Sequence, residues 1–154
     1  MWEDPARMAV LMELFTVGYQ GRTLPQFVRL LEEHDIARLV DVRERPASRK
    51  RGFSALPLFD ALRKAGITYE SDRALGNPVE IRDLWKNGSL AEGKNRYRSL
   101  LRNGRRPRVE LLLAHARVER VCILCFEGDP EVCHRSVIAE EAARLAPELV
   151  IRHL

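Results

Sequence analysis

The sequence predicts one α/β domain with a largely parallel, Rossmann-like sheet that carries helices on both faces. Three observations support this fold class. The chain of 154 residues is long enough to bury a core. Its composition, 45% hydrophobic and 31% charged, is typical of a globular protein. Apolar β-branched segments alternate with amphipathic ones, which implies right-handed crossovers between parallel strands.

Hydrophobic periodicity places the elements in order along the chain. Strands are predicted at 14–20, 37–44, 67–70, 118–127 and 148–154. Helices are predicted at 24–34, 54–65, 78–88, 97–101, 107–116 and 137–145. Thr23 and Gln26 have the spacing of a capping box, Ser54 and Ser136 can cap the helices that follow them, and Gly66 is a C-terminal stop.

The domain is predicted to occupy 14–154, preceded by a leader at 1–13. The signal is weakest at about 71–108, which is interpreted as a helical or loop insert. No window approaches the roughly 18 consecutive apolar residues that a membrane span needs, and the apolar patch in the leader is too short for a signal peptide. Three cysteines without a secretory signal predict a reducing, cytoplasmic location and argue against a disulfide framework.

Basic residues are concentrated in two segments. The net charge is only +4, yet 94–108 carries seven basic and no acidic groups, and 41–53 carries five basic and two acidic groups. Arginine, whose planar fork matches phosphate, supplies all but four of the basic residues. This distribution favours a phosphate-bearing partner, although solvated charge runs and an arginine-rich genome are alternative explanations.

Three loops are predicted to share one edge of the sheet. They follow the first, second and fourth strands, at 18–22, 41–52 and 125–135. In open α/β sheets, ligands bind beyond the carboxyl ends of the strands. The chemically active residues of these loops are therefore predicted to be neighbours.

The segment CFEGDPEVCHRS, Cys125 to Ser136, admits three interpretations. Cys125, Cys133 and His134 are zinc-ligand types, but adjacent residues usually point apart, which argues against a metal. Cys133, close to a helix N-terminus and beside His134 and Arg135, could be an activated nucleophile or a buried apolar group. The favoured interpretation is an anion pocket in which Arg135 and free helix N–H groups face the edge of the sheet. Its alternative is that Arg135 pairs with an acid and only ties loops together.

Other candidate residues surround this segment. Asp41 and Glu127 each end a strand and could divide general acid and base work, or pair with arginines. Arg43 could supply a second anion clamp. The further candidates for binding substrate or anion are Tyr19, Arg22, Ser48, Arg49 and Tyr69. Ordinary packing for the tyrosines and a solvated loop around Ser48 and Arg49 are the alternatives.

The chain resembles domain-of-unknown-function family 488, a group of small bacterial and archaeal α/β proteins. The matching segments are TVGYQGR, LVDVRERPASR, ITYESDRALGNP and LCFEGDPEVCHRSVIAE, with D-V-R and C-x-E-x5-C-H-R as the specific motifs and the first loop as the weaker match. The resemblance implies a compact domain in which the motif residues line a common cleft: Asp41, Arg43, Glu127, Cys133, His134 and Arg135. It implies no activity, and the basic segment 94–108 lies outside it.

These observations together predict a hydrolase-type enzyme that acts on a nucleic acid or nucleotide through an arginine-lined anion pocket. The predicted catalytic residues are Asp41, Glu127, Cys133 and His134. A non-catalytic nucleic-acid-binding module and a thiol- or metal-dependent enzyme on a small metabolite are the alternatives. No cofactor is predicted, a divalent metal is left open, and the predicted partner is a nucleic acid or a phosphate-bearing small molecule rather than a membrane.

Overall fold

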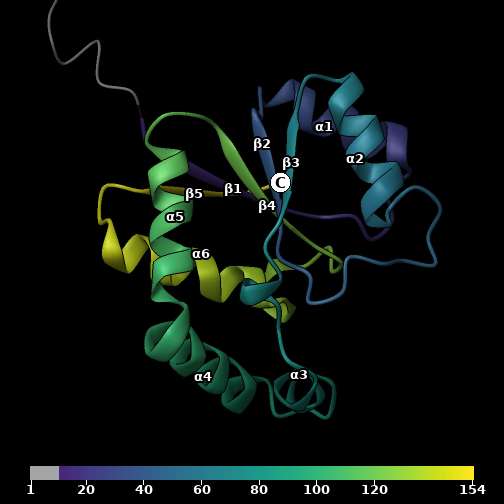
Figure 1. Ribbon diagram of the computed structural model, residues 1–154. Coiled ribbons are helices and arrows are strands. Elements are labelled where there is room, and N and C mark those ends of the chain that lie inside the picture. The colour runs from purple at the N-terminus through teal and green to yellow at the C-terminus, as the bar shows by residue number, and fades with distance from the viewer. Residues whose placement is uncertain (1–10) are drawn as a thin grey trace, which may run out of the picture.

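Five parallel strands form the sheet in the computed structural model, which describes residues 11–154 (Figure 1). The strands are β1 (Glu13–Gly18), β2 (Arg38–Asp41), β3 (Thr68–Ser71), β4 (Val121–Cys125) and β5 (Val150–His153). Their order is β3-β2-β4-β1-β5, and every neighbouring pair is parallel. The prediction of a largely parallel sheet is confirmed, and the carboxyl ends of all five strands lie at one edge.

Helices cover both faces of this sheet, as predicted (Figure 1). They are α1 (Leu24–Glu33), α2 (Ala55–Lys64), α3 (Val79–Lys86), α4 (Leu90–Leu100), α5 (Arg106–Ala116) and α6 (His134–Leu145). One core contains α1 and α2, and the other contains α4, α5 and α6. Side chains along the central strand β4 alternate between the two cores. Cys122 and Leu124 face α1 and α2, while Ile123 and Cys125 face α6.

Two of the predicted N-terminal caps differ from the structure, and the helix predicted at 97–101 is α4, which begins at Leu90. The capping box of Thr23 and Gln26 is present at the start of α1. Ser54 is the N-cap residue of α2, but its hydroxyl bonds the backbone of Ser48 instead of the helix. Ser136 lies inside α6, because the helix begins at His134 with Cys133 as its N-cap residue. The Ser136 hydroxyl donates back to the Cys133 carbonyl, 2.9 Å away.

The insert at 71–108 is helical and forms part of the core that also contains α5 and α6. Buried Leu75, Tyr97 and Leu101 join that core, and the Tyr97 hydroxyl donates to the Leu75 carbonyl at 2.5 Å. The chain leaves α4 through a kinked π-helical segment, Leu101–Arg105. This packing places α3 beyond the carboxyl ends of the strands, where it can wall a pocket (Figure 1).

The predicted leader at 1–13 overlaps the sheet at its last residue. β1 begins at Glu13, whose buried carboxylate pairs with Arg120 and Arg152, while most of the leader lies outside the described residues. No helix within 11–154 is long and apolar enough to cross a membrane.

Candidate functional site

The loops after β1, β2 and β4 meet at the carboxyl edge of the sheet, as the sequence predicts. The backbone N–H of Gln20 donates to the Phe126 carbonyl at 2.9 Å, and the Gly128 N–H donates to the Gln20 side chain at 3.0 Å. Gly18 permits this approach, because a Cβ there would lie 1.8 Å from the Glu127 carbonyl oxygen. The first and third loops therefore form one tightly packed unit.

Asp41, predicted as an acid or base, is instead the centre of a buried hydrogen-bond network. Its side chain is fully buried and accepts from Arg43 Nε at 2.8 Å, Arg43 Nη2 at 2.7 Å and the Tyr69 hydroxyl at 2.6 Å. It also accepts from the Arg43 backbone N–H at 3.1 Å. Both carboxylate oxygens are thus occupied, which leaves Asp41 no free oxygen for proton transfer.

Arg43 is equally committed to protein partners. Its Nη1 donates to the Phe53 carbonyl at 2.7 Å and to the Tyr19 hydroxyl at 3.4 Å. Burial lowers the Arg43 pKa, but the hydrogen bonds and charge of Asp41 outweigh burial and leave the pKa raised. Burial and the Asp41 hydrogen bond raise the Tyr69 pKa as well. These residues form a fixed, charged wall, and Arg43 lines the pocket described below.

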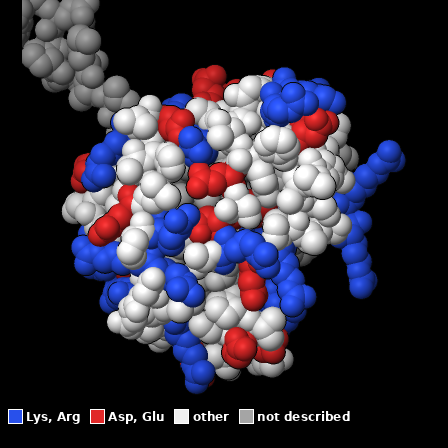
Figure 2. All heavy atoms as spheres, viewed as in Figure 1, with Lys and Arg blue, Asp and Glu red and all other residues white. Residues whose placement is uncertain are grey.

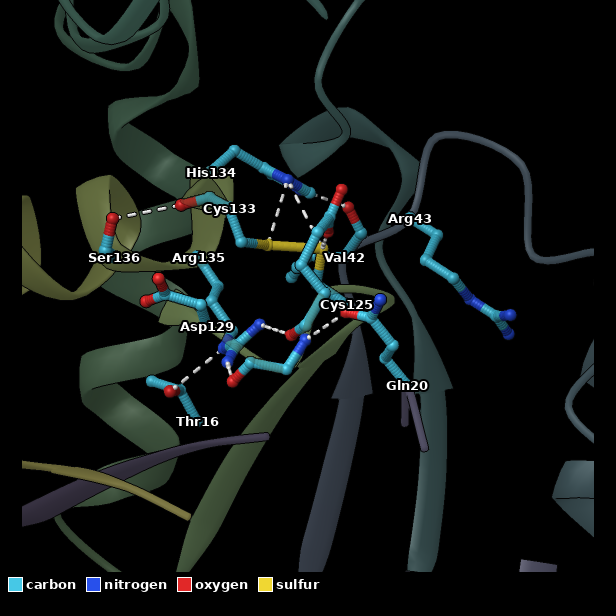
Figure 3. The surroundings of a disulfide bond; sticks show 12 residues. Thr16, Gln20, Val42, Arg43, Cys125, Asp129, Cys133, His134, Arg135 and Ser136 are labelled. Atoms are coloured by element: carbon cyan, nitrogen blue, oxygen red, sulfur yellow. Dashed lines mark hydrogen bonds between the residues drawn. A yellow bond between two sulfur atoms is a disulfide. The ribbon is translucent and has the colours of Figure 1, made fainter. Parts of the chain in front are cut away.

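Arg135 ties the 126–129 loop to β1. Its guanidinium is fully buried and donates to Thr16 Oγ1 at 3.2 Å, to the Gly128 carbonyl at 3.1 Å and to the Glu127 carbonyl (Figure 3). Burial lowers its pKa. The arrangement corresponds to the loop-tying alternative, with carbonyl groups as the partners in place of a carboxylate, and Arg135 does not line the pocket described below.

Cys125 and Cys133 form a disulfide, so the prediction that argued against disulfides is corrected (Figure 3). The two residues are eight positions apart, and the 126–132 loop folds back so that the N-cap residue of α6 meets the end of β4. Cys122 is a buried free thiol in the opposite core, and burial raises its pKa.

His134 lies over this disulfide, contrary to the expectation that adjacent Cys133 and His134 point apart (Figure 3). Its Nδ1 is 3.6 Å from Cys125 Sγ and 3.7 Å from Cys133 Sγ, and its Nε2 lies 2.8 Å from the Val42 carbonyl. The carbonyl can only accept, so Nε2 carries the proton and Nδ1 presents a lone pair to the sulfur atoms. Burial lowers the His134 pKa to about 4, which keeps the ring neutral at pH 7.

A pocket of about 390 Å³ opens beside these residues, between the strand edge and α3. We call it the edge pocket. Its lining combines aromatic, basic and acidic side chains from the three loops and from the insert: Tyr19, Arg43, Glu44, Arg45, Ala47, Asn77, Arg82, Trp85, Lys86, Cys125, Phe126, Glu127, Val132 and His134. Its volume falls in the range of small-molecule sites.

Three residues that line the edge pocket carry a buried polar atom without a hydrogen-bond partner within the described residues. These atoms are Glu44 Oε2, Asn77 Oδ1 and Trp85 Nε1. Buried polar groups in proteins are nearly always hydrogen-bonded. All three atoms are shielded from solvent, and Trp85 Nε1 packs against Gly93 of α4, so they are not among the groups that the pocket presents to a ligand.

Only some of the predicted site residues line the edge pocket. Tyr19, Arg43, Glu127 and His134 do, and Asp41, Tyr69, Cys133 and Arg135 lie behind its wall. Arg22 donates to the Gly18 carbonyl at 3.2 Å, while Ser48 and Arg49 belong to the β2–α2 loop and do not line the pocket.

The wall that α3 contributes to the pocket was not predicted from the sequence. Arg82, Trp85 and Lys86 line the pocket from one face of that helix. Their i, i+3 and i+4 spacing was a readable signal of a shared face. Nothing in the sequence placed that face against the strand edge.

The arginine-rich segment 94–108 is largely paired with carboxylates. In Figure 2, Lys and Arg side chains alternate with Asp and Glu over the lower part of the molecule, and no continuous basic surface is visible on this face. The pairs are Lys94–Glu131, Arg96–Glu92, Arg98–Glu140, Arg102–Glu141, Arg106–Glu110 and Arg108–Asp72. Neither Arg45 nor Lys86, by contrast, pairs with a carboxylate of residues 11–154.

Comparison with known proteins identifies the family. The model of the family described as "Domain of unknown function DUF488" matches residues 23–142, which is more than half of the chain. The chain belongs to the DUF488 family. The match begins after the first loop and includes Asp41, Arg43 and the segment from Cys125 to Arg135. Searches of curated proteins and of solved structures gave no match. The DUF488 assignment carries no activity with it.

Substituting Asp41 tests whether its charge holds the DUF488 strand edge together. Asp41→Asn leaves the buried Arg43 guanidinium without its counter-charge, so the free energy of unfolding should fall by about 3–5 kcal/mol. Urea denaturation measures this change. Asp60→Asn is the matched control, because its pairs with Arg63 and Lys64 are exposed and should contribute little to stability. An equal fall in the free energy of unfolding for both substitutions would contradict the stabilising role of the Asp41 network.

The buried His134 ring predicts a pH dependence of stability in the disulfide form. The folded pKa of about 4 lies below the unfolded value of roughly 6.5. The unfolded chain therefore binds this proton first, and the unfolding free energy should fall by about 3 kcal/mol as the pH drops from about 6.5 to 4. His134→Gln should lose this component, measured as the difference between the two denaturation profiles. Parallel profiles for wild type and variant would contradict the assignment.

Proposed function

We propose that the chain is a hydrolase that acts on a phosphate-bearing small molecule of nucleotide size in the edge pocket. The observation that carries this proposal is the pocket's lining. Glu127 shares it with the aromatic ring of Trp85 and with Arg45 and Lys86, two cations that pair with no carboxylate in the described part of the chain. A volume of about 390 Å³ suits a nucleotide-sized ligand better than a polymer.

The charges of the pocket support an anionic ligand. Arg45, Arg82 and Lys86 bring three cations to its rim, and only Arg82 has a carboxylate of the described residues nearby, with Glu44 Oε2 at 3.9 Å. Ion pairing of a phosphate with such groups is charge-assisted and directional. Exposed cations facing a concave surface also raise the local concentration of anions.

The aromatic residues that line the pocket support a ligand that carries a planar ring as well as a phosphate. The Tyr19 ring stacks on Phe53, with centroids 4.6 Å apart, and meets Phe126 edge-on at 5.3 Å. Tyr19, Trp85 and Phe126 all line the pocket, and aromatic faces bind bases without demanding one sequence.

Glu127 is the residue we propose as general base. It is half-buried and lines the pocket, whereas both oxygens of Asp41 are bound to Arg43 and Tyr69. A paired-carboxylate mechanism would need two free acids. The proposal is therefore that Glu127 takes a proton from a water molecule while the cations hold the phosphate group.

A non-catalytic nucleic-acid-binding module is the competing function. The ion pairs of segment 94–108 argue against it, because a paired arginine must lose its carboxylate before it can bind a backbone phosphate. In its favour, basic side chains project from the β2–α2 loop at the right edge of Figure 2. Salt-dependent binding of oligonucleotides separates the two functions.

Calorimetric titration with a panel of ribonucleoside mono- and diphosphates tests the proposal. At least one should bind the wild-type protein, and Lys86→Ala and Arg82→Ala should each weaken its dissociation constant by about tenfold or more. Lys64→Ala, which alters an exposed lysine on α2, is the control and should leave the constant unchanged. Glu127→Gln should retain binding and lower turnover by about 10²-fold or more, measured by product chromatography. Binding of single-stranded oligonucleotides but of no mononucleotide would contradict the proposal.

A further inference from the structure

We propose that the reduced chain binds one zinc ion through Cys125, Cys133 and His134, with its fourth coordination position open to the edge pocket. Two thiolates and an imidazole are ligand types that zinc prefers, and three protein ligands with one open position are typical of catalytic zinc. The three ligand atoms lie within 4.8 Å of one another. The disulfide uses both sulfur atoms, so this site belongs to the reduced form of the protein.

The spacing of the imidazole fits zinc coordination. Zinc bonds sulfur at about 2.3 Å and nitrogen at about 2.0–2.1 Å, so a tetrahedral ion holds its sulfur and nitrogen ligands about 3.6 Å apart. His134 Nδ1 is 3.6 Å from Cys125 Sγ and 3.7 Å from Cys133 Sγ. The ring is thus already placed at ligand distance from both sulfur atoms.

The distance between the backbones of Cys125 and Cys133 leaves room for an ion between their sulfur atoms. Their Cα atoms are 7.2 Å apart, beyond the usual range of about 4.4–6.8 Å for disulfide-linked residues. On reduction, side-chain rotation alone can separate the sulfur atoms to the roughly 3.8 Å that two thiolates on one zinc ion need. The cysteines come from the end of β4 and from the N-cap of α6, two elements packed in one core.

The orientation of His134 is fixed by a partner outside the cluster. Its Nε2–H donates to the Val42 carbonyl at 2.8 Å, which turns the unprotonated Nδ1 toward the sulfur atoms (Figure 3). Metal-binding histidines are characteristically held by such a hydrogen bond from the other ring nitrogen. The Tyr97 ring packs edge-on against the imidazole, with centroids 5.3 Å apart, and restricts its rotation further.

The open position would face the proposed general base. Cys125 and His134 line the edge pocket, whereas Cys133 is buried behind them. Glu127 Oε2 is 2.9 Å from Cys125 Sγ, close enough to accept a proton from water bound at the open position. This part of the inference rests on the proposed hydrolase function, since zinc would lower the pKa of the attacking water.

Redox chemistry links the two forms. Two molecules of a small thiol reduce the disulfide to two Cys thiols and leave as one small disulfide, and zinc then displaces the two thiol protons. In the reverse direction, a small disulfide takes two electrons and two protons from the cysteines, which become Cys125–Cys133 again. Oxidation therefore removes two of the three ligands, and the ion is released.

Metal titration of the full chain tests the site without any substrate. Protein reduced by a phosphine and kept free of oxygen should bind one zinc ion per chain after gel filtration, and its cobalt complex should show a thiolate charge-transfer band. The oxidised protein should bind none. Cys133→Ser and His134→Gln should weaken zinc binding by at least about 100-fold, because each removes a direct ligand.

Cys122→Ala is the matched control, since it removes a buried thiol from the opposite core and should keep the stoichiometry and the cobalt band. Circular dichroism confirms that each variant is folded, and zinc protection of Cys125 from alkylation in the wild-type chain gives a readout that needs no variant. No metal in the reduced wild-type protein, or equal loss in Cys122→Ala, would overturn the inference. Zinc binding without turnover would overturn the hydrolase proposal alone, whereas turnover by the metal-free reduced protein would support the hydrolase proposal and overturn the catalytic role of the zinc ion.

Discussion

Strands β1, β2 and β4 run in the same direction, and the candidate site depends on this constraint. Because they are parallel, the loops that follow them meet at one edge of the sheet. Strand pairing does not set the conformation of these loops, and two buried arginines fix it. Arg135 holds the 126–129 loop against β1, and Arg43 joins Asp41 to the β2–α2 loop through the Phe53 carbonyl. The edge pocket forms on this rigid base.

These contacts distinguish charged residues that bond protein partners from charged residues that can contact a ligand, a difference that the sequence does not show. Asp41, Arg43 and Arg135 are charged and lie in the motif segments, yet their hydrogen-bonding groups are directed at protein partners. Glu127, Arg45 and Lys86 keep groups that can face a ligand. Burying a charge with its partner gives a fixed wall, because breaking the pair would leave an uncompensated charge in the core. The half-buried and exposed charges around that wall are the ones available for chemistry.

The sequence predicted the five strands and the shared edge because hydrophobic periodicity and strand direction are local or topological properties. It could not predict that α3 walls the pocket, which depends on Gly76 packing so closely on the β2–α2 loop that a Cβ would lie 2.5 Å from the Glu44 Cα. The Cys125–Cys133 pairing was also missed, because it requires the 126–132 loop to fold back on β4. The prediction that Arg135 faces a ligand differs from the structure. Sequence spacing does not show that its position in α6 points into the core.

The central claim is that a nucleotide-sized anion binds in the edge pocket against α3. Fluorescence of Trp85 tests this claim most directly, because its indole lines the pocket. A Trp2→Phe background leaves Trp85 as the single tryptophan. Titration with the ribonucleoside phosphates should change its emission saturably, and the change should be lost in Lys86→Ala at the same concentrations. Binding seen by calorimetry with no change in Trp85 emission would place the ligand elsewhere and contradict the account.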